Sequence, residues 1–144
     1  MIRVLIVDDH DFFRLCLVDL VTSAHDLVAV GECRDGSEVL ETARALEPDV
    51  VLMDVRMGSR SGLEAADDLR QAGHRARVVL LTSDPVLPRR ADAEARGVVG
   101  HLTKGVAGER VLEAVRSVAG GGTAWPEDTD PRAAGARPDM RSAR

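Results

Sequence analysis

The chain has 144 residues, of which 44% are hydrophobic and 30% are charged, so it is long enough for one globular domain with a buried core. Its formal net charge is −5, and the acidic excess falls entirely within residues 1–119. An acidic domain lacks the basic surface that direct binding to nucleic acid requires, so the composition argues against a nucleic-acid-binding domain.

The cysteine content and the N-terminus point to the cytoplasm. The two cysteines, Cys16 and Cys33, lie in no CxxC or Cys/His spacing typical of zinc sites, so we expect reduced thiols. The N-terminus leads directly into a strand pattern rather than a signal peptide, and no apolar run reaches membrane-spanning length. We therefore expect a soluble, cytoplasmic protein with no membrane partner.

Short apolar runs rich in β-branched residues alternate with segments of helical periodicity. In chain order, the runs predict strands over Ile2–Val7, Leu27–Cys33, Asp49–Met53, Arg77–Thr82 and Gly97–Leu102. Alternating strands and helices predict an α/β domain, a doubly wound, flavodoxin-like parallel sheet of five strands in the order 2-1-3-4-5 with five helices. Nearly continuous apolar strands fit this fold, because helices cover both faces of such a sheet.

Two segments depart from this regular pattern. The helix expected between Asp84 and Arg96 has few apolar residues, and Pro85 and Pro88 push its start later, so we expect it to be mobile. After Ala119 the composition changes to glycine, proline and mixed charge, which predicts a domain over residues 1–119 and a linker or disordered tail over 120–144. Trp125 either anchors that tail to the domain or is solvated.

Polar residues stand at the ends of several predicted strands. Asp8 and Asp9 follow the first strand and Asp54 the third, and these strands are neighbours in the expected order. Thr82 ends the fourth strand, and Lys104, the only lysine of the chain, follows the fifth. A single aspartate after a strand is usually a turn or cap residue, but these positions together predict a site at one edge of the sheet.

The residue types at this edge favour phosphoryl-transfer chemistry. Carboxylates this close together raise one another's proton affinity, so a divalent cation is their natural partner, and Mg²⁺ binds one or two carboxylates in such sites. Lys104 would add a second positive charge and Thr82 a hydroxyl donor. Charge neutralisation and alignment of this kind are the main contribution of a protein to phosphoryl transfer.

Four blocks of sequence resemble the receiver domain of two-component response regulators, in order and in spacing: "VLIVDDHD", "VLMDVRMGSRSGLE", "VVLLTSD" and "GHLTKG". The first and last blocks further resemble the subfamily that carries a LuxR-type helix-turn-helix output domain. The resemblance implies that Asp54 accepts phosphate from a sensor histidine kinase, and that Thr82 and Lys104 hold the phosphoryl oxygens. Such a domain is not an enzyme beyond its own phosphorylation and dephosphorylation.

The resemblance also implies a Mg²⁺ site and a possible assembly. Asp9, Asp54 and the main-chain carbonyl of Arg56 would bind the ion, with Asp8 acting through water. The subfamily suggests that phosphorylation leads to a homodimer through the first and last helices, and the last helix is expected to leave apolar residues uncovered by the sheet.

Several residues depart from the family pattern or have no expected role in it. Gly58 and Gly105 replace prolines, so we expect a more mobile loop after Asp54 and no cis peptide after Lys104. His101 occupies the position of a switch aromatic residue. The remaining histidines have no ligand spacing and are expected at the surface or the rim of the site: His10, His25 and His74.

The flanks of the site suggest a control on hydrolysis. Arg56 and Asp84 stand two residues beyond Asp54 and Thr82, and an ion pair between them would hinder the water that attacks the acyl phosphate. An exposed ion pair of this kind contributes little to stability.

The interpretation that fits best is a phosphorylation-activated receiver that switches an output, and that output is expected to be transcription. The tail is too short and polar for a helix-turn-helix, so DNA would be contacted only through an output domain outside this chain. A stand-alone receiver that binds another protein is the alternative. A Mg²⁺-dependent phosphohydrolase would need a carboxylate at the position of Arg56, and a mononucleotide binder would need a phosphate loop after the first strand.

Overall fold

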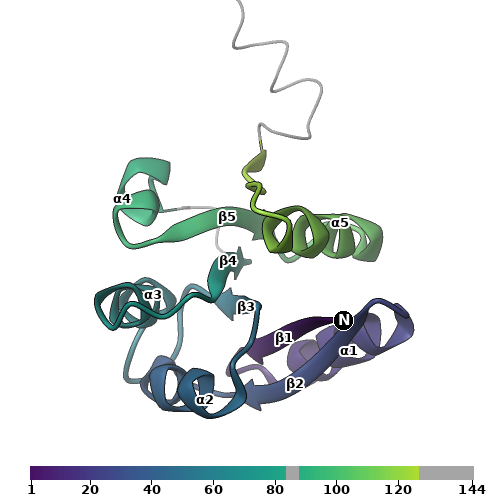
Figure 1. Ribbon diagram of the computed structural model, residues 1–144, viewed down its shortest axis with the longest axis horizontal. Helices are drawn as coiled ribbons and strands as arrows, with labels where there is room; N and C mark the ends of the chain where they lie inside the picture. The colour runs from purple at the N-terminus through teal and green to yellow at the C-terminus, as the bar shows by residue number, and fades with distance from the viewer. Residues whose placement is uncertain (84–87, 127–144) are drawn as a thin grey trace, which may run out of the picture.

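The computed structural model describes residues 1–83 and 88–126. Strands and helices alternate along these residues (Figure 1). The strands are β1 (Ile2–Val7), β2 (Leu27–Cys33), β3 (Val50–Asp54), β4 (Arg77–Thr82) and β5 (Val98–Thr103). The helices are α1 (Asp11–Ser23), α2 (Val39–Leu46), α3 (Gly62–Gln71), α4 (Arg90–Ala95) and α5 (Gly108–Ala119), with a short 3₁₀ turn over Gly36–Glu38 before α2.

The strands form one parallel sheet in the order β2-β1-β3-β4-β5, which confirms the predicted fold. Two strands begin and end one residue later than predicted. Asp49 belongs to the turn before β3, where its carboxylate accepts hydrogen bonds from the Arg3 backbone and the Arg75 side chain. Gly97 has a φ of +86°, which a strand residue does not adopt, so β5 begins after it.

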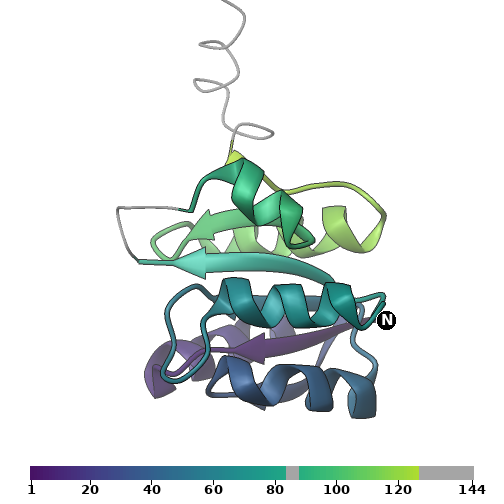
Figure 2. The same cartoon turned by 90° about the vertical axis from the view of Figure 1, so that its left-hand side faces the viewer.

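Helices cover both faces of the sheet. Helices α1 and α5 lie on one face, and α2, α3 and α4 lie on the other (Figure 1); the latter three face the viewer in Figure 2. Alternate residues of the central strands point into two separate hydrophobic clusters, one under each helical layer. The inner residues of β1, β3 and β4 are almost completely buried, as the apolar runs predicted.

Helix α5 buries its apolar residues. Val111, Leu112, Val115 and Val118 all belong to the core cluster beneath α1 and α5. The expectation that the last helix leaves apolar residues uncovered is therefore wrong. Among the described residues, the exposed large hydrophobic side chains near a helix are Phe12 and Leu15 of α1. Dimerisation on phosphorylation stays a prediction.

Helix α4 is the shortest helix of the described residues, at six residues, and it begins two residues after Pro88. The predicted late start is therefore confirmed, since a proline disfavours helical conformation in the residue before it. Residues 84–87, with Asp84 and Pro85 among them, lie outside the described residues. The mobility of this helix stays a prediction.

The chain continues along the sheet after α5 instead of leaving it. The backbone N–H of Ala124 donates to the Val99 carbonyl at 2.9 Å, and that of His101 donates to the Ala124 carbonyl at 3.1 Å, so Ala124 pairs with the edge strand β5. Trp125 is only 2% exposed and packs in the cluster under α2, α3 and α4. The packed structure thus reaches Trp125, past the expected boundary at Ala119. Residues 127–144 lie outside the described part, so the disordered tail stays a prediction there.

Gly100 makes this pairing possible. A Cβ atom at Gly100 would lie 2.8 Å from the Cβ of Ala124 and 3.0 Å from its carbonyl oxygen, so any other residue would push the segment away. On the outer side of the segment, the guanidinium of Arg90 in α4 lies 4.7 Å from the centre of the Trp125 ring. The segment therefore links the sheet edge to α4, and the solvated alternative for Trp125 is wrong.

Candidate functional site

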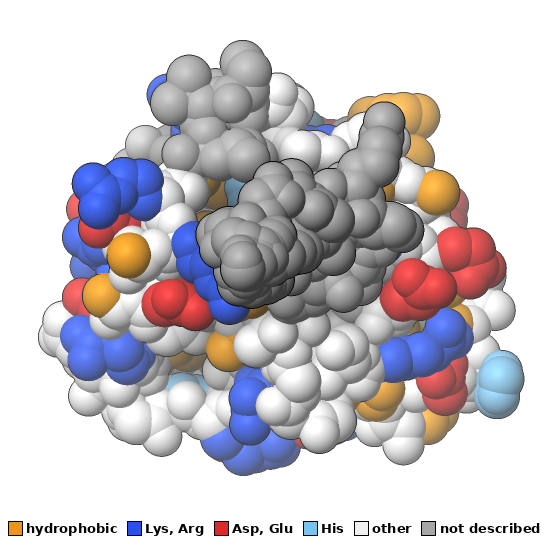
Figure 3. All heavy atoms as spheres, turned by 90° about the horizontal axis from the view of Figure 1, so that it is seen from above, with side chains coloured by type: hydrophobic (Ala, Val, Ile, Leu, Met, Phe, Trp, Pro, Cys, Tyr) orange, Lys and Arg blue, Asp and Glu red, His pale blue; other side chains and the backbone are white. Residues whose placement is uncertain are grey.

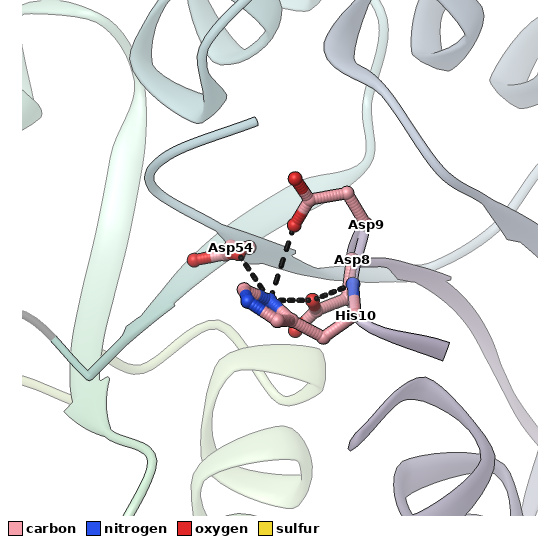
Figure 4. A group of neighbouring side chains, drawn as sticks. All are labelled: Asp8, Asp9, His10 and Asp54. Carbon is pink, nitrogen blue, oxygen red and sulfur yellow. Dashed lines mark hydrogen bonds and ion pairs between the residues drawn. The ribbon is translucent and has the colours of Figure 1, made fainter. Parts of the chain in front are cut away.

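The carboxyl ends of β1 and β3 bring three aspartates together. Asp8 and Asp9 follow β1 directly, and Asp54 is the last residue of β3, so their side chains meet at one edge of the sheet (Figure 4). Asp8 is 1% exposed and Asp54 4% exposed, whereas Asp9 lies at the surface. One ligand atom from each of these residues and from His10 lies within 4.8 Å of all the others.

Lys104 reaches the buried pair of carboxylates from the end of β5. Its Nζ atom lies 2.8 Å from Oδ2 of Asp8 and 3.3 Å from Oδ2 of Asp54. The side chain is only 11% exposed. The backbone N–H of Lys104 donates to the carbonyl of Thr82 at 2.8 Å, and Thr82 is the buried last residue of β4. Two residues predicted for the site are thus tied together through the main chain.

The charged groups at this edge do not fully stabilise the ionised form of Asp54. Burial, followed by the neighbouring carboxylate of Asp8, raises the pKa of Asp54 above its usual value, although Lys104 and a backbone hydrogen bond from Arg56 act against this shift. A divalent cation among the carboxylates would favour the ionised form. The all-carboxylate set of Asp8, Asp9 and Asp54 fits Mg²⁺, which prefers oxygen ligands.

His10 makes contacts that its sequence position did not predict. It lies on the rim, as expected, but its Nδ1 is 3.2 Å from Oδ1 of Asp8, 3.1 Å from Oδ1 of Asp9 and 3.8 Å from Oδ2 of Asp54 (Figure 4). Its backbone N–H also donates to Oδ1 of Asp8 at 2.8 Å. The only sequence signal for these contacts is its place directly after the two aspartates.

The other two histidines lie away from this cluster. His25 is exposed, as expected. His74 is not a surface residue, because its side chain is only 8% exposed and its ring nitrogens contact the Ala43 carbonyl at 3.2 Å and the Ala76 N–H at 3.0 Å. The surface expectation is wrong for His74 because its imidazole is nearly buried and contacts main-chain groups of two segments.

Arg14 supports the end of β1 from helix α1. Its guanidinium is buried and donates to the main-chain carbonyl of Asp8 at 2.8 Å, to Glu32 at 2.9 Å and to Asp11 at 2.8 Å. The carboxylate of Asp11 raises the pKa of Arg14, which keeps this buried group charged. The sequence analysis assigned no role to Arg14, and its only signal is an arginine between apolar positions of a helix.

The loop between Asp54 and α3 is held by side-chain hydrogen bonds. Asp35 accepts the backbone N–H of Ser59 at 2.7 Å and its hydroxyl at 2.8 Å. At the end of the loop, Ser61 and Glu64 form a capping box that starts α3. A side chain at Gly62 would collide with the main-chain oxygen of Asp54, so this glycine lets α3 approach the site closely. The greater mobility expected from Gly58 stays a prediction.

Three further predicted residues have different outcomes. His101 is buried in β5, opposite Leu80 of β4. No cis peptide occurs in residues 1–83 and 88–126, in agreement with the expectation at Gly105. Asp84 lies outside the described residues, so its ion pair with Arg56 stays a prediction, as does the part of the Arg56 carbonyl in metal binding.

Basic and acidic side chains both lie on the face of the molecule that is seen from above (Figure 3). No helix in the described part of the chain is both long enough and apolar enough to cross a bilayer.

Comparisons with known proteins agree with the geometry. Residues 4–116 match the family described as the response regulator receiver domain. The chain is similar to the response regulator GacA of Pseudomonas aeruginosa, with 40% identity over 124 residues that cover 84% of this chain and 56% of GacA. It is also similar to the nitrate/nitrite response regulator protein NarL of Escherichia coli, with 33% identity over 118 residues that cover 82% of this chain and 55% of NarL. The chain therefore spans about half the length of these relatives.

Solved structures show the same fold. The signal receiver domain of NarL from Mycobacterium tuberculosis has a TM-score of 0.77 at 32% identity, and the match covers 83% of this chain and 97% of that domain. A two-component response regulator of the LuxR family from Aurantimonas sp. has a TM-score of 0.83 at 27% identity, with 94% and 96% covered.

Proposed function

Because this chain belongs to the response regulator receiver family, we propose that it is a phosphorylation-activated signalling receiver whose acceptor is Asp54. One observation carries the proposal. The carboxylate of Asp54 lies at the carboxyl end of β3, beside two further carboxylates and within 3.3 Å of the ammonium of Lys104. Such an arrangement of an acceptor oxygen, a cation site and a fixed positive charge suits phosphoryl transfer.

The transfer follows from the roles that these residues can take. An oxygen of Asp54 forms a bond to the phosphorus atom of a phosphohistidine, the P–N bond breaks, and its electron pair stays on the imidazole nitrogen of the donor. In this proposal, Lys104 and the hydroxyl of Thr82 bind the phosphoryl oxygens. The acyl phosphate is lost later by hydrolysis, so the protein is a substrate of signalling reactions rather than a classical enzyme.

Mg²⁺ would be held by Asp9, Asp54 and the carbonyl of Arg56, with Asp8 acting through water. When bound, the ion supplies positive charge that offsets the phosphoryl oxygens and the three carboxylates. Asp8 keeps its contact with Lys104 and so fixes the ammonium beside the acceptor. Asp9 lies at the surface, where it is open to an incoming ion.

We further propose a sensor histidine kinase as phosphate donor and transcription as output. The relatives are named as response regulators, and one from Bacillus subtilis, at 33% identity, is named the transcriptional regulatory protein LnrK. This chain covers 58% of that relative, and in this proposal DNA is contacted only through an output domain that is not in this chain. A receiver that acts by binding another protein would differ in having no DNA-bound assembly after phosphorylation.

Intact-mass measurement tests the proposed function. Protein incubated with Mg²⁺ and a small acyl phosphate is expected to gain the mass of one phosphoryl group, and the gain should disappear when Mg²⁺ is chelated. Asp54→Asn should take up none. Uptake by the Asn variant at the wild-type level would refute the assignment of the acceptor.

A further inference from the structure

The aromatic ring of Phe13 lies against the ammonium group of Lys104. The Nζ atom is 4.5 Å from the ring centre, within the range of a cation–π interaction. Phe13 belongs to the first turns of α1 and is half-buried against the core cluster beneath α1 and α5. A helix on one face of the sheet thus contacts the functional group that β5 delivers to the site.

The ammonium of Lys104 contacts two carboxylates and one aromatic ring. Asp8 and Asp54 contact it at 2.8 and 3.3 Å, and the face of the Phe13 ring covers it from α1. The Lys104 side chain is 11% exposed, so most of it is removed from water. A cation–π contact is stronger at a desolvated position of this kind than at the surface.

The ammonium of Lys104 needs a contact such as that with the Phe13 ring to hold it in place, because the lysine side chain is flexible. The backbone is fixed by the hydrogen bond from its N–H to the Thr82 carbonyl, but four flexible methylene groups separate that backbone from the charge. Among these neighbours, the Phe13 ring is the one apolar group in contact with the ammonium.

We propose that Phe13 is a positioning residue, which acts through Lys104 by holding its ammonium over the acceptor oxygen of Asp54. The proposal rests on the proposed function of that site, and it adds a residue from α1 to the parts that determine the rate of phosphorylation. The competing explanation is that Phe13 only fills space between α1 and the strand ends. The two explanations differ in what an aliphatic side chain of similar bulk would do.

The chain offers a spectroscopic test that does not depend on phosphorylation. Lys104 is the only lysine, so protein labelled with ¹³C-lysine gives a single set of lysine signals in an NMR spectrum. In the wild type, the ε-methylene protons should be shifted upfield by the ring current of Phe13. Phe13→Leu should remove this shift, and Phe13→Tyr and Phe13→Trp should keep it.

Phe12 provides a matched control in the same helix. It is 80% exposed, so Phe12→Leu makes the same chemical change one residue away and should leave the lysine signal in place. An unshifted lysine signal in the wild type would overturn the proposal, and so would a signal that Phe13→Leu leaves unchanged in a protein that remains folded by circular dichroism.

A kinetic arm connects the contact to function. With Mg²⁺ and a small acyl phosphate, Phe13→Leu should be phosphorylated about tenfold more slowly than the wild type, and Phe13→Tyr within about threefold of it. In a Lys104→Met background, Phe13→Leu should change the rate by less than about twofold, because the group it positions is gone. An equally slow Tyr variant, or a full tenfold loss in the Met background, would show that Phe13 acts by packing alone.

The two arms separate the possible failures. A wild type with a shifted lysine signal that takes up no phosphate would refute the proposed function while the contact stands. A wild type that is phosphorylated normally, with Phe13→Leu equally fast, would refute the positioning role alone.

Discussion

The two helical layers of this sheet are built differently. The layer of α1 and α5 consists of two helices of 13 and 12 residues, which cover their face along its length. The opposite layer has three helices of 8, 10 and 6 residues, and beside the shortest, α4, the cover is completed by Trp125. At its β5 end, the second face therefore depends on Trp125, a residue that follows α5 in the chain.

The site draws on both layers unequally. The α1 layer supplies Arg14, which holds the end of β1, and Phe13, which contacts Lys104. The opposite layer meets the site through α3, which packs on the Asp54 backbone at Gly62. The β1 and Lys104 side of the site is thus held by residues of the 13-residue helix α1, whereas Asp54 is approached by α3 of the opposite layer.

The largest expected effect comes from removing the side chain that completes the weaker layer. Trp125→Ala should lower the free energy of unfolding by about 3–5 kcal/mol, because a large buried aromatic group is lost and a cavity remains. Phe12→Ala on exposed α1 surface should change it by less than about 0.5 kcal/mol. Urea unfolding of both variants measures the difference. Similar free energies of unfolding for the two would mean that Trp125 does not stabilise this face of the sheet.

A somewhat smaller effect should follow from displacing the segment without changing Trp125. Gly100→Ala places a methyl group against Ala124 and should cost about 1–3 kcal/mol. Gly105→Ala meets no atom within 4 Å and serves as the matched control, with a change of less than about 0.5 kcal/mol. Thermal unfolding of the two variants measures the difference. A Gly100→Ala variant as stable as the wild type would show that the segment around Ala124 can move away from β5 without loss of stability.

The third expected effect on stability comes from Asp54, which lies at the end of a strand between the two helical layers. Its pKa is raised in the folded protein, so the folded state holds this proton more tightly and stability falls as pH rises from the unfolded value of about 3.9 through the folded one. Without metal, Asp54→Asn should therefore be more stable than the wild type at pH 7, and the difference should vanish below about pH 4. Denaturant titrations in chelator at both pH values provide the measurement; a variant less stable at pH 7 would contradict the charge balance described above.

The smallest effect should come from the edge of the α1 and α5 layer. Arg116 of α5 holds Asp26 at 2.8 Å and lowers its pKa to about 2. The stability from this pair is present above the unfolded pKa of about 3.9 and is lost as pH falls through about 2. Asp26→Asn should flatten that part of the acid unfolding curve slightly, and an unchanged curve would mean that the exposed pair contributes nothing.

The sequence was sufficient for the fold because its signals are local. Apolar β-branched runs predicted the five strands within one residue, and the errors fell where turn residues such as Asp49 and Gly97 decide the boundary. The parallel order then placed Asp8, Asp54 and Lys104 at one edge.

Contacts between residues distant in sequence were beyond such reasoning. The burial of Trp125 depends on a glycine 25 positions earlier, and the Phe13 ring meets Lys104 only after the whole sheet has formed. His74 illustrates the same limit, since its polarity suggested the surface while its nitrogens found main-chain partners from two different segments.

The pairing of Ala124 with Gly100 also bears on how the domain behaves beside its own copies. Strand β5 is an edge of the sheet, and an edge with free backbone groups is a template on which a second chain can add a strand. The N–H of His101 and the carbonyl of Val99 are occupied by Ala124, so this part of the edge is closed to such growth. A shortened chain ending at Ala119 would lack Ala124, and we expect the N–H of His101 and the carbonyl of Val99 then to be open to pairing with a second chain.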